Sequence, residues 1–76
     1  MTKSKNHRTQ NLYEAAYLYA KGFKLNGKDD EGQKTIIFLE GEGVHEEAMK
    51  YYNGGTIEAK AYTDSYRTIK DYIFER

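Results

Sequence analysis

Few side chains in this sequence could carry out catalysis. The two histidines are His7 and His45, the serines are Ser4 and Ser65, and there is no cysteine. Covalent catalysis needs a nucleophile, a base that activates it and a group that orients the base. These four positions do not suggest such a set, and no two carboxylates fall on segments that clearly converge. The sequence therefore predicts a protein that is not an enzyme and has no catalytic residue.

Two short motifs approximate ligand-binding loops, but each lacks a residue that its chemistry requires. Residues 22–29 approach the phosphate-binding loop, yet Asp29 stands where a serine or threonine would hold magnesium, and its carboxylate would repel phosphate. Residues 29–40 have the acidic ends of a calcium loop, but Lys34 occupies the sixth position, where a sharp turn requires glycine. Both segments are better interpreted as turn and strand.

A third motif concerns metal binding. His45 and Glu46 begin like the helix of a zinc protease, but Met49 stands where the second histidine is required. His45 could hold a metal ion weakly with Glu42 and Glu46. Acidic residues are also common at the start of a helix, because they face the positive end of the helix dipole. We favour this second interpretation, so the sequence predicts no metal and no other cofactor.

Tyrosine is the most distinctive component of the composition, with eight residues among 76 and no tryptophan. Tyrosine is favoured in interfaces because it offers a large contact area for little lost side-chain entropy. The formal net charge is zero, but residues 29–47 hold seven acidic residues and one basic residue. We therefore predict a protein-binding surface that combines tyrosines with this acidic patch: Tyr13, Tyr17, Tyr51, Glu42, Glu46 and Glu47.

The basic residues near the N-terminus support an alternative, a weak nucleic-acid-binding module. Lys3, Lys5 and Arg8 could contact phosphates. Tyr13 and Tyr17 on the following helix could stack on bases. So few cations release few counterions, and the affinity would therefore be low at physiological salt.

The first helix is expected over about residues 10–21. Asn11 followed three residues later by Glu14 has the form of a capping box, and Thr9 is a competing N-cap. Apolar residues recur at helical spacing through this segment. Gly22 suits the left-handed turn that ends many helices.

An antiparallel hairpin is expected after this helix. Residues 23–25 alternate in polarity, and residues 35–39 are β-branched and aromatic. Turn-forming residues fill the interval, which places the loop near residues 29–32.

Two further helices are expected in the second half of the chain. The first is short and amphipathic, starts near Val44 and ends at the sequence Asn53-Gly54-Gly55. Residues 55–58 should be extended and residues 59–75 helical. The alternation over residues 56–61 fits either a strand or the start of that last helix.

These elements predict an α+β fold with the order α-β-β-α-(β)-α, in which the antiparallel hairpin packs against the helices because a small sheet is not stable alone. Residues 1–8 should form a flexible basic arm, and residues 9–76 a single domain. No apolar segment resembles a secretory signal or approaches the length of a membrane helix. Together with the lack of cysteine, this favours a cytoplasmic location. The expected core consists of Leu12, Ala16, Phe23, Ile36, Phe38, Ala48, Ile69 and Ile73.

Several segments resemble a family of small bacterial and phage proteins that is known only as a domain of unknown function. The likeness covers about residues 9–74 and supports a helix over residues 59–75. It implies a phage or mobile-element origin and carries over no catalytic residue. The matching segments are the helix Leu12, Ala15, Ala16, Tyr17, Leu18 with Gly22-Phe23, the strand Thr35 to Leu39, the helix end Tyr51 to Gly54, and the pair Ile69-Lys70.

Our hypothesis from the sequence is a small, non-enzymatic protein, encoded by a phage or mobile element, that binds a protein partner and so inhibits a host system. The sequence does not identify that partner, and it predicts no association with a membrane. A monomer is slightly favoured over a homodimer, because lysines along an exposed strand edge discourage pairing between copies.

Overall fold

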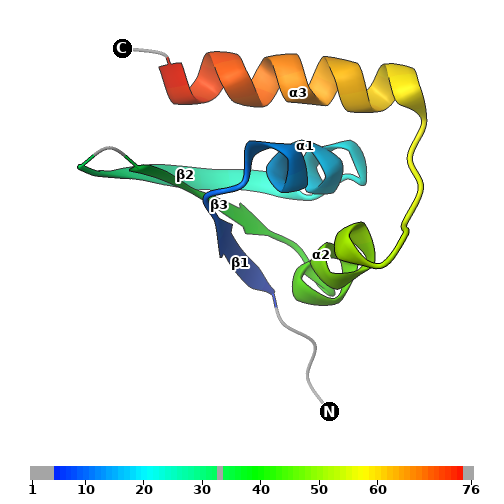
Figure 1. Cartoon of the computed structure of the whole chain (residues 1–76). Helices are drawn as coiled ribbons and strands as arrows, with labels where there is room; N and C mark the ends of the chain where they lie inside the picture. The colour runs from blue at the N-terminus through cyan, green and yellow to red at the C-terminus, as the bar shows by residue number, and fades with distance from the viewer. Residues whose placement is uncertain (1–4, 33, 75–76) are drawn as a thin grey trace.

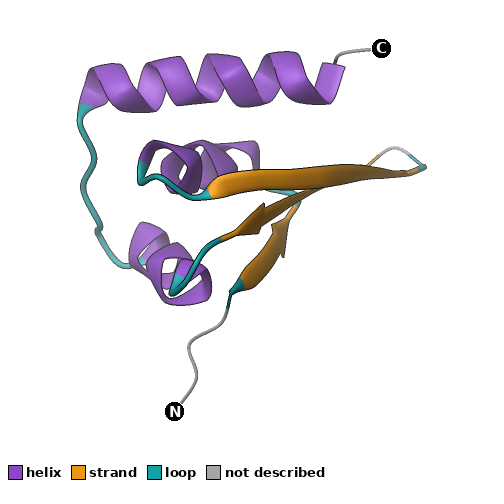
Figure 2. Cartoon of the chain, turned by 180° about the vertical axis from the view of Figure 1, so that it is seen from behind, coloured by secondary structure: helices purple, strands orange, loops and turns teal. Residues whose placement is uncertain are grey.

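The computed structural model describes residues 5–32 and 34–74. In this part of the chain a three-stranded antiparallel sheet with the strand order β1-β3-β2 carries its helices on one side (Figure 1). Helix α1 lies between the sheet and α3, as the view from behind also shows (Figure 2). The predicted α+β class is confirmed. The elements are β1 (Asn6–Thr9), α1 (Leu12–Ala20), β2 (Lys24–Glu31), β3 (Lys34–Glu40), α2 (Val44–Tyr52) and α3 (Ala59–Phe74).

The N-terminal segment differs from the flexible arm expected over residues 1–8. Residues 6–9 form β1, which pairs with β3 so that His7 lies opposite Leu39 and Thr9 opposite Ile37. Residues 1–4 lie outside the described part of the chain. The third strand thus comes from the N-terminus, and residues 55–58, where an extended piece was expected, connect α2 to α3 without pairing. A four-residue polar strand has no apolar alternation, so the pattern could not indicate it.

Helix α1 begins and ends as its sequence predicts. The Asn11 side chain accepts hydrogen bonds from the backbone N–H groups of Tyr13 (2.9 Å) and Glu14 (3.3 Å). At the other end, the Phe23 N–H donates to the Leu18 carbonyl (3.2 Å), and Gly22 has a φ of 105°. This is a Schellman ending, which requires a left-handed residue that glycine adopts without strain.

The core uses the opposite face of β3 from the one expected. Ile37 and Leu39 point toward the helices, whereas Ile36 and Phe38 alternate to the other face of the sheet and stay outside the main cluster. Ile36 is nevertheless buried, as expected, whereas Phe38 is half-buried, so the expected core position of Phe38 is wrong. Among the other expected core residues, Ala16, Ala48 and Ile69 are buried, and Leu12, Phe23 and Ile73 pack at the edge of the cluster. The buried cluster itself consists of Ala15, Tyr17, Leu18, Ile37, Leu39, Val44, Ala48 and Ile69.

Helix α3 is joined to the sheet by a side chain of β2. The Lys28 ammonium group donates to the backbone carbonyls of Tyr72 (2.8 Å) and Ile73 (3.2 Å) at the C-terminal end of the helix. A cation is favourable at this end because the helix dipole is negative there. Ile69 is fully buried, so α3 is held at its middle by packing and at its end by Lys28.

Candidate functional site

A buried carboxylate lies where β1, α1 and α2 meet. Glu14 is only 3% exposed. Its carboxylate accepts hydrogen bonds from His7 Nε2 (2.6 Å) and Thr9 Oγ1 (2.8 Å) on β1, and from the Tyr52 hydroxyl (2.8 Å) on α2. Three donors from two neighbouring elements compensate for the loss of water around this charge. We call Glu14, His7, Thr9 and Tyr52 the Glu14 network.

The Glu14 network replaces the expected capping box. Glu14 does not serve the backbone N–H of Asn11, because Thr9 Oγ1 accepts that hydrogen bond at 3.0 Å. Thr9 in turn donates its hydroxyl proton to Glu14. Asn11 is therefore the N-cap, and Thr9 is not, because its hydroxyl accepts only the N–H of the cap residue itself. The carboxylate of Glu14 binds side chains instead.

The Glu14 network brings the two histidines of the chain together, although they lie 38 positions apart. The Nδ1 atoms of His7 and His45 are 3.5 Å apart, and their ring centroids are 5.5 Å apart. His7 is mostly covered, with a side chain 14% exposed, whereas His45 is exposed at the start of α2. Nothing in the sequence links these residues, because β1 itself has no recognisable pattern.

Six of the eight tyrosines, all in the described part of the chain, gather around α1, the end of α2 and the start of α3. The Tyr13 ring stacks on Tyr66 with centroids 5.4 Å apart, and Tyr52 meets Tyr51 edge-on at 4.9 Å. The Asn11 amide donates to the Tyr52 hydroxyl (3.4 Å) and thereby links the two pairs. We call the set Tyr13, Tyr17, Tyr51, Tyr52, Tyr62 and Tyr66 the tyrosine cluster.

The outer members of the tyrosine cluster are open to solvent. Tyr13 is 54% exposed and Tyr52 is 59% exposed. Met49 precedes Tyr52 by three residues on the same side of α2 and is 50% exposed. These three side chains therefore expose apolar area, and the rings of Tyr13 and Tyr52 contact those of Tyr66 and Tyr51.

Four phenols of the tyrosine cluster, those of Tyr17, Tyr52, Tyr62 and Tyr66, have a pKa above that of free tyrosine. Burial, followed by the charges that Tyr51, Tyr13 and Tyr66 would carry, raises the pKa of Tyr62. Burial and the nearby Tyr13 phenol raise the pKa of Tyr66. The hydrogen bond from Asn11 lowers the pKa of Tyr52, but its bond to Glu14, burial and the Glu14 charge outweigh that effect and raise it.

The residues predicted to bind a partner do not form one surface. Tyr17 is only 2% exposed, so it cannot meet a partner as expected. Its hydroxyl donates to Glu47 (3.1 Å), and burial and this carboxylate raise the pKa of Tyr17. Glu47 also lies 3.7 Å from the Lys50 ammonium group and 3.9 Å from that of Lys21. Tyr13 and Tyr51 belong to the tyrosine cluster.

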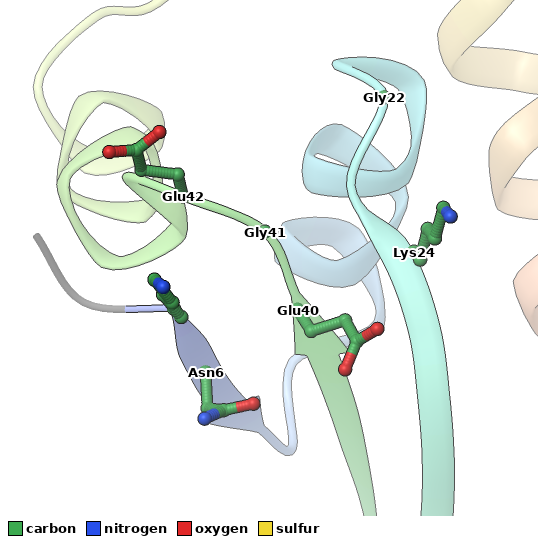
Figure 3. A pocket seen from close by; sticks show the side chains of 7 residues that line it. Asn6, Gly22, Lys24, Glu40, Gly41 and Glu42 are labelled. Carbon is green, nitrogen blue, oxygen red and sulfur yellow. The ribbon is translucent and has the colours of Figure 1, made fainter.

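The other two predicted acidic residues lie apart. Glu46 is exposed in the first turn of α2. Glu42 is exposed in the loop before that helix and lines a shallow pocket of about 610 Å³ beside the ends of β1, β2 and β3 (Figure 3). In the figure its carboxylate points away from that of Glu40, so the two acids do not converge. The lining also includes Lys5 and Lys24, and the opposite charges leave the pocket without a dominant sign.

The predicted nucleic-acid-binding residues are also separated. Lys3 lies outside the described residues, and Lys5 lines the shallow pocket. Arg8 is exposed and pairs in register with Phe38, on the sheet face opposite the helices, since its neighbours in β1 bind Glu14. Tyr13 belongs to α1, on the face of the sheet that carries the helices. The geometry therefore does not place the cations and the stacking residues on one surface.

Residues 5–32 and 34–74 contain neither a three-ligand metal site nor a membrane-spanning helix. No group of three or more histidine, cysteine, aspartate or glutamate residues is arranged to hold one metal ion there. Over the same residues, no helix combines the length and apolar character required to cross a membrane.

Comparison with known proteins gives one match. The model of a family described as a domain of unknown function, DUF5659, matches residues 4–75. No curated protein and no solved structure matches the chain.

Proposed function

The chain belongs to the family DUF5659, a domain of unknown function, and from the geometry of the tyrosine cluster we propose that it binds another protein without catalysing a reaction. The proposal includes its biological setting: a phage or mobile element encodes the protein, which acts in the cytoplasm by occupying a host protein and inhibiting it. The only support for this biological setting is the resemblance of the sequence to small bacterial and phage proteins. The binding surface is supported by the structure of the cluster.

The observation that carries the proposal is the exposed apolar area of Tyr13, Met49 and Tyr52, each at least half exposed. Apolar area of this kind is stabilised when a partner removes it from water. Tyrosine and methionine are both enriched in the centres of protein interfaces.

The cluster is also organised before any partner binds. Tyr13 is held by stacking on Tyr66, and Tyr52 is held by hydrogen bonds to Glu14 and from Asn11. Side chains that already have one conformation lose less entropy on binding, so more of the contact energy appears as affinity. The proposed surface thus presents two held aromatic side chains, Tyr13 on α1 and Tyr52 on α2.

Protein binding is favoured over nucleic-acid binding by the placement of charge. The described cations of the predicted nucleic-acid set are Lys5, which lines the shallow pocket at the strand ends, and Arg8 on β1. Of these, Arg8 faces away from the helices. A nucleic-acid surface would need cations beside the stacking rings to neutralise phosphates.

Site-specific photocrosslinking tests the proposal. A photoreactive phenylalanine derivative replaces Met49 in one variant and Phe74 in another, and each protein is irradiated in cells of its natural host. Phe74 is a matched control because it is 68% exposed yet lies at the far end of α3. We expect a discrete covalent adduct with one protein from position 49 and none from position 74.

A second substitution links the adduct to the tyrosine cluster. Tyr13→Ala, introduced beside the photoreactive residue at position 49, should reduce the yield of the adduct while the far-ultraviolet circular dichroism stays unchanged. Equal adducts from both positions would indicate nonspecific capture and contradict the proposal. Crosslinking to nucleic acid instead of protein would support the alternative function.

A further inference from the structure

We propose that His7 and His45 form a binding site for a divalent transition metal ion of the zinc class, with Glu14 as the residue that orients His7. The site does not depend on the proposed protein-binding function. It rests on the distance between the two imidazole rings and on the hydrogen bond made by the outer nitrogen of His7.

The spacing of the two rings suits a shared ion. The Nδ1 atoms lie 3.5 Å apart, which is longer than the roughly 2.7–3.2 Å of ordinary hydrogen bonds. Two nitrogens bound at about 2.0–2.1 Å to a tetrahedral zinc ion lie about 3.3–3.4 Å apart. Binding an ion between the Nδ1 atoms therefore requires only a small change in the distance between the two rings. His45 can move by this amount because its side chain is exposed at the start of α2.

The hydrogen bonding of His7 directs its Nδ1 toward that ion. His7 Nε2 lies 2.6 Å from a carboxylate oxygen of Glu14 and donates its proton there. In the neutral imidazole this leaves a lone pair on Nδ1, the atom that faces His45. Histidines that bind metals in proteins commonly donate their other ring N–H to a carboxylate, which fixes the tautomer and raises the basicity of the ligand.

Glu14 is itself held in place for this role. Thr9 and Tyr52 donate to its oxygens from two different elements, and the residue is 3% exposed. The carboxylate cannot turn toward the ion, since it lies beyond the far nitrogen of His7. Glu14 is therefore a positioning residue and not a ligand.

The chemistry of the two ligands selects the ion. Imidazole suits zinc, copper and nickel, whereas magnesium and calcium prefer oxygen ligands. No third histidine, cysteine or carboxylate in the described part of the chain is arranged to join the pair. Water would complete the coordination, so the site would be open and its affinity moderate.

Zinc titration of the full chain, labelled with ¹⁵N and free of any affinity tag, tests the proposal. The chain has two histidines and no cysteine, so each imidazole signal is assigned without ambiguity. We expect both Nδ1 resonances, and not the Nε2 resonances, to shift along one saturable curve with one ion per chain. Calcium and magnesium, added as controls, should shift neither ring.

Three variants distinguish ligands from neighbours. His45→Gln should weaken zinc binding at least tenfold in calorimetry. Glu58→Gln, the control at an exposed carboxylate in the segment between α2 and α3, should leave the affinity unchanged. Glu14→Gln should weaken binding about 10–100-fold, as loss of an orienting partner does. If this last variant fails to fold, His45→Gln and the shifts of the Nδ1 resonances still test whether both histidines bind the ion.

Several results would overturn the proposal. Wild-type affinity in His45→Gln would exclude His45 as a ligand. A shift at only one ring, or at Nε2, would exclude the shared ion. One ion bound between two chains, seen as a doubled mass in sedimentation, would place the site between copies and not within one chain.

Discussion

The carboxylate of Glu14 lies at the junction of β1, α1 and α2 and accepts a hydrogen bond from both of the other two elements. A buried charge is tolerated only when it is paired and hydrogen-bonded. No buried side-chain nitrogen or oxygen in the described part of the chain lacks a hydrogen-bond partner. At the residue scale, one acidic side chain thus joins a strand and two helices, and the Tyr52 donor on α2 lies 38 positions along the chain from Glu14.

Glu14→Ala is expected to destabilise the protein by about 3–5 kcal/mol, because it leaves His7, Thr9 and Tyr52 without their shared acceptor. Urea unfolding followed by circular dichroism measures the change. Glu46→Ala is the matched control, since Glu46 is exposed and its removal should change stability by no more than about 0.5 kcal/mol. Equal effects of the two substitutions would show that the Glu14 network contributes nothing.

Alkaline pH should unfold the protein through its tyrosines. The pKa values of Tyr17, Tyr52 and Tyr62 are raised in the folded chain above the ordinary value of about 10. The unfolded chain therefore loses these protons first as the pH rises, and unfolding becomes easier. The stabilisation that these three phenols contribute is complete below about pH 10 and is lost as the pH rises through their pKa values in the folded chain.

The midpoint of urea unfolding, measured at a series of pH values, checks this expectation. It should be steady near neutral pH and fall above about pH 10. Tyr17→Phe removes the most buried of these phenols and should make the fall less steep. A midpoint independent of pH in this range would mean that the phenols are not perturbed.

Strand β3 shows how an element divides its side chains between two environments. Ile37 is 1% exposed within the core cluster, whereas Phe38 lies on the open face opposite the helices. Both residues belong to one apolar run, Ile36 to Leu39, which has no alternation to indicate its inner face. The inner face follows from β1, whose His7 and Thr9 point to Glu14 and lie opposite Leu39 and Ile37.

Substitutions at adjacent positions of β3 should therefore have unequal effects. Ile37→Ala should cost about 2–5 kcal/mol, the range for deleting methyl groups from a packed core. Phe38→Ala should cost no more than about 1–2 kcal/mol, because Phe38 lies outside the core cluster and its ring is already partly exposed in the folded protein. Chemical denaturation of both variants compares them directly. A larger effect at Phe38 would show that the open face is covered, for example by a second copy.

At the scale of the whole molecule, the fold depends on contacts between segments that are far apart in the sequence. Strand β1 pairs with β3, and Lys28 of β2 binds the end of α3. The sheet has helices on one face only, as Figures 1 and 2 show. β1 and β2 are the edge strands of this sheet, and each has one unpaired edge within it. A monomer at low concentration stays our expectation, which light scattering over a range of concentrations can check.

Removal of residues 1–9 should abolish folding. The truncation deletes β1 and two of the three donors to Glu14, and it leaves β3 unpaired on one side. We expect the circular dichroism of a largely unfolded chain. Removal of residues 1–4, which keeps β1, is the control and should preserve cooperative unfolding. A folded protein after the longer truncation would mean that the segment is the dispensable arm predicted from sequence.

The sequence by itself determined the elements that depend on neighbouring residues. The cap at Asn11, the Schellman turn at Gly22 and the glycines after α2 are local, because each interaction joins residues only a few positions apart. The presence of a hairpin and of α3 was predicted from turn residues and apolar spacing. The expected hairpin loop near residues 29–32 is wrong, because β2 extends over Lys24–Glu31 and Asp29 to Glu31 pair with Ile36 to Lys34. Of the predicted partner-binding tyrosines, the structure exposes Tyr13 and half-buries Tyr51, and their binding of a partner stays a prediction.

Only the tertiary structure decided which residues face one another across the chain. In the structure, residues 6–9 form a strand and Ile37, not Phe38, faces the core. Tyr17 is buried, and His7 lies beside His45. Each of these outcomes rests on pairing between segments about 30 or more positions apart, for which no local pattern exists. The free energy that selects them comes from packing and from hydrogen bonds to Glu14, and it arises only when β1, α1 and α2 meet.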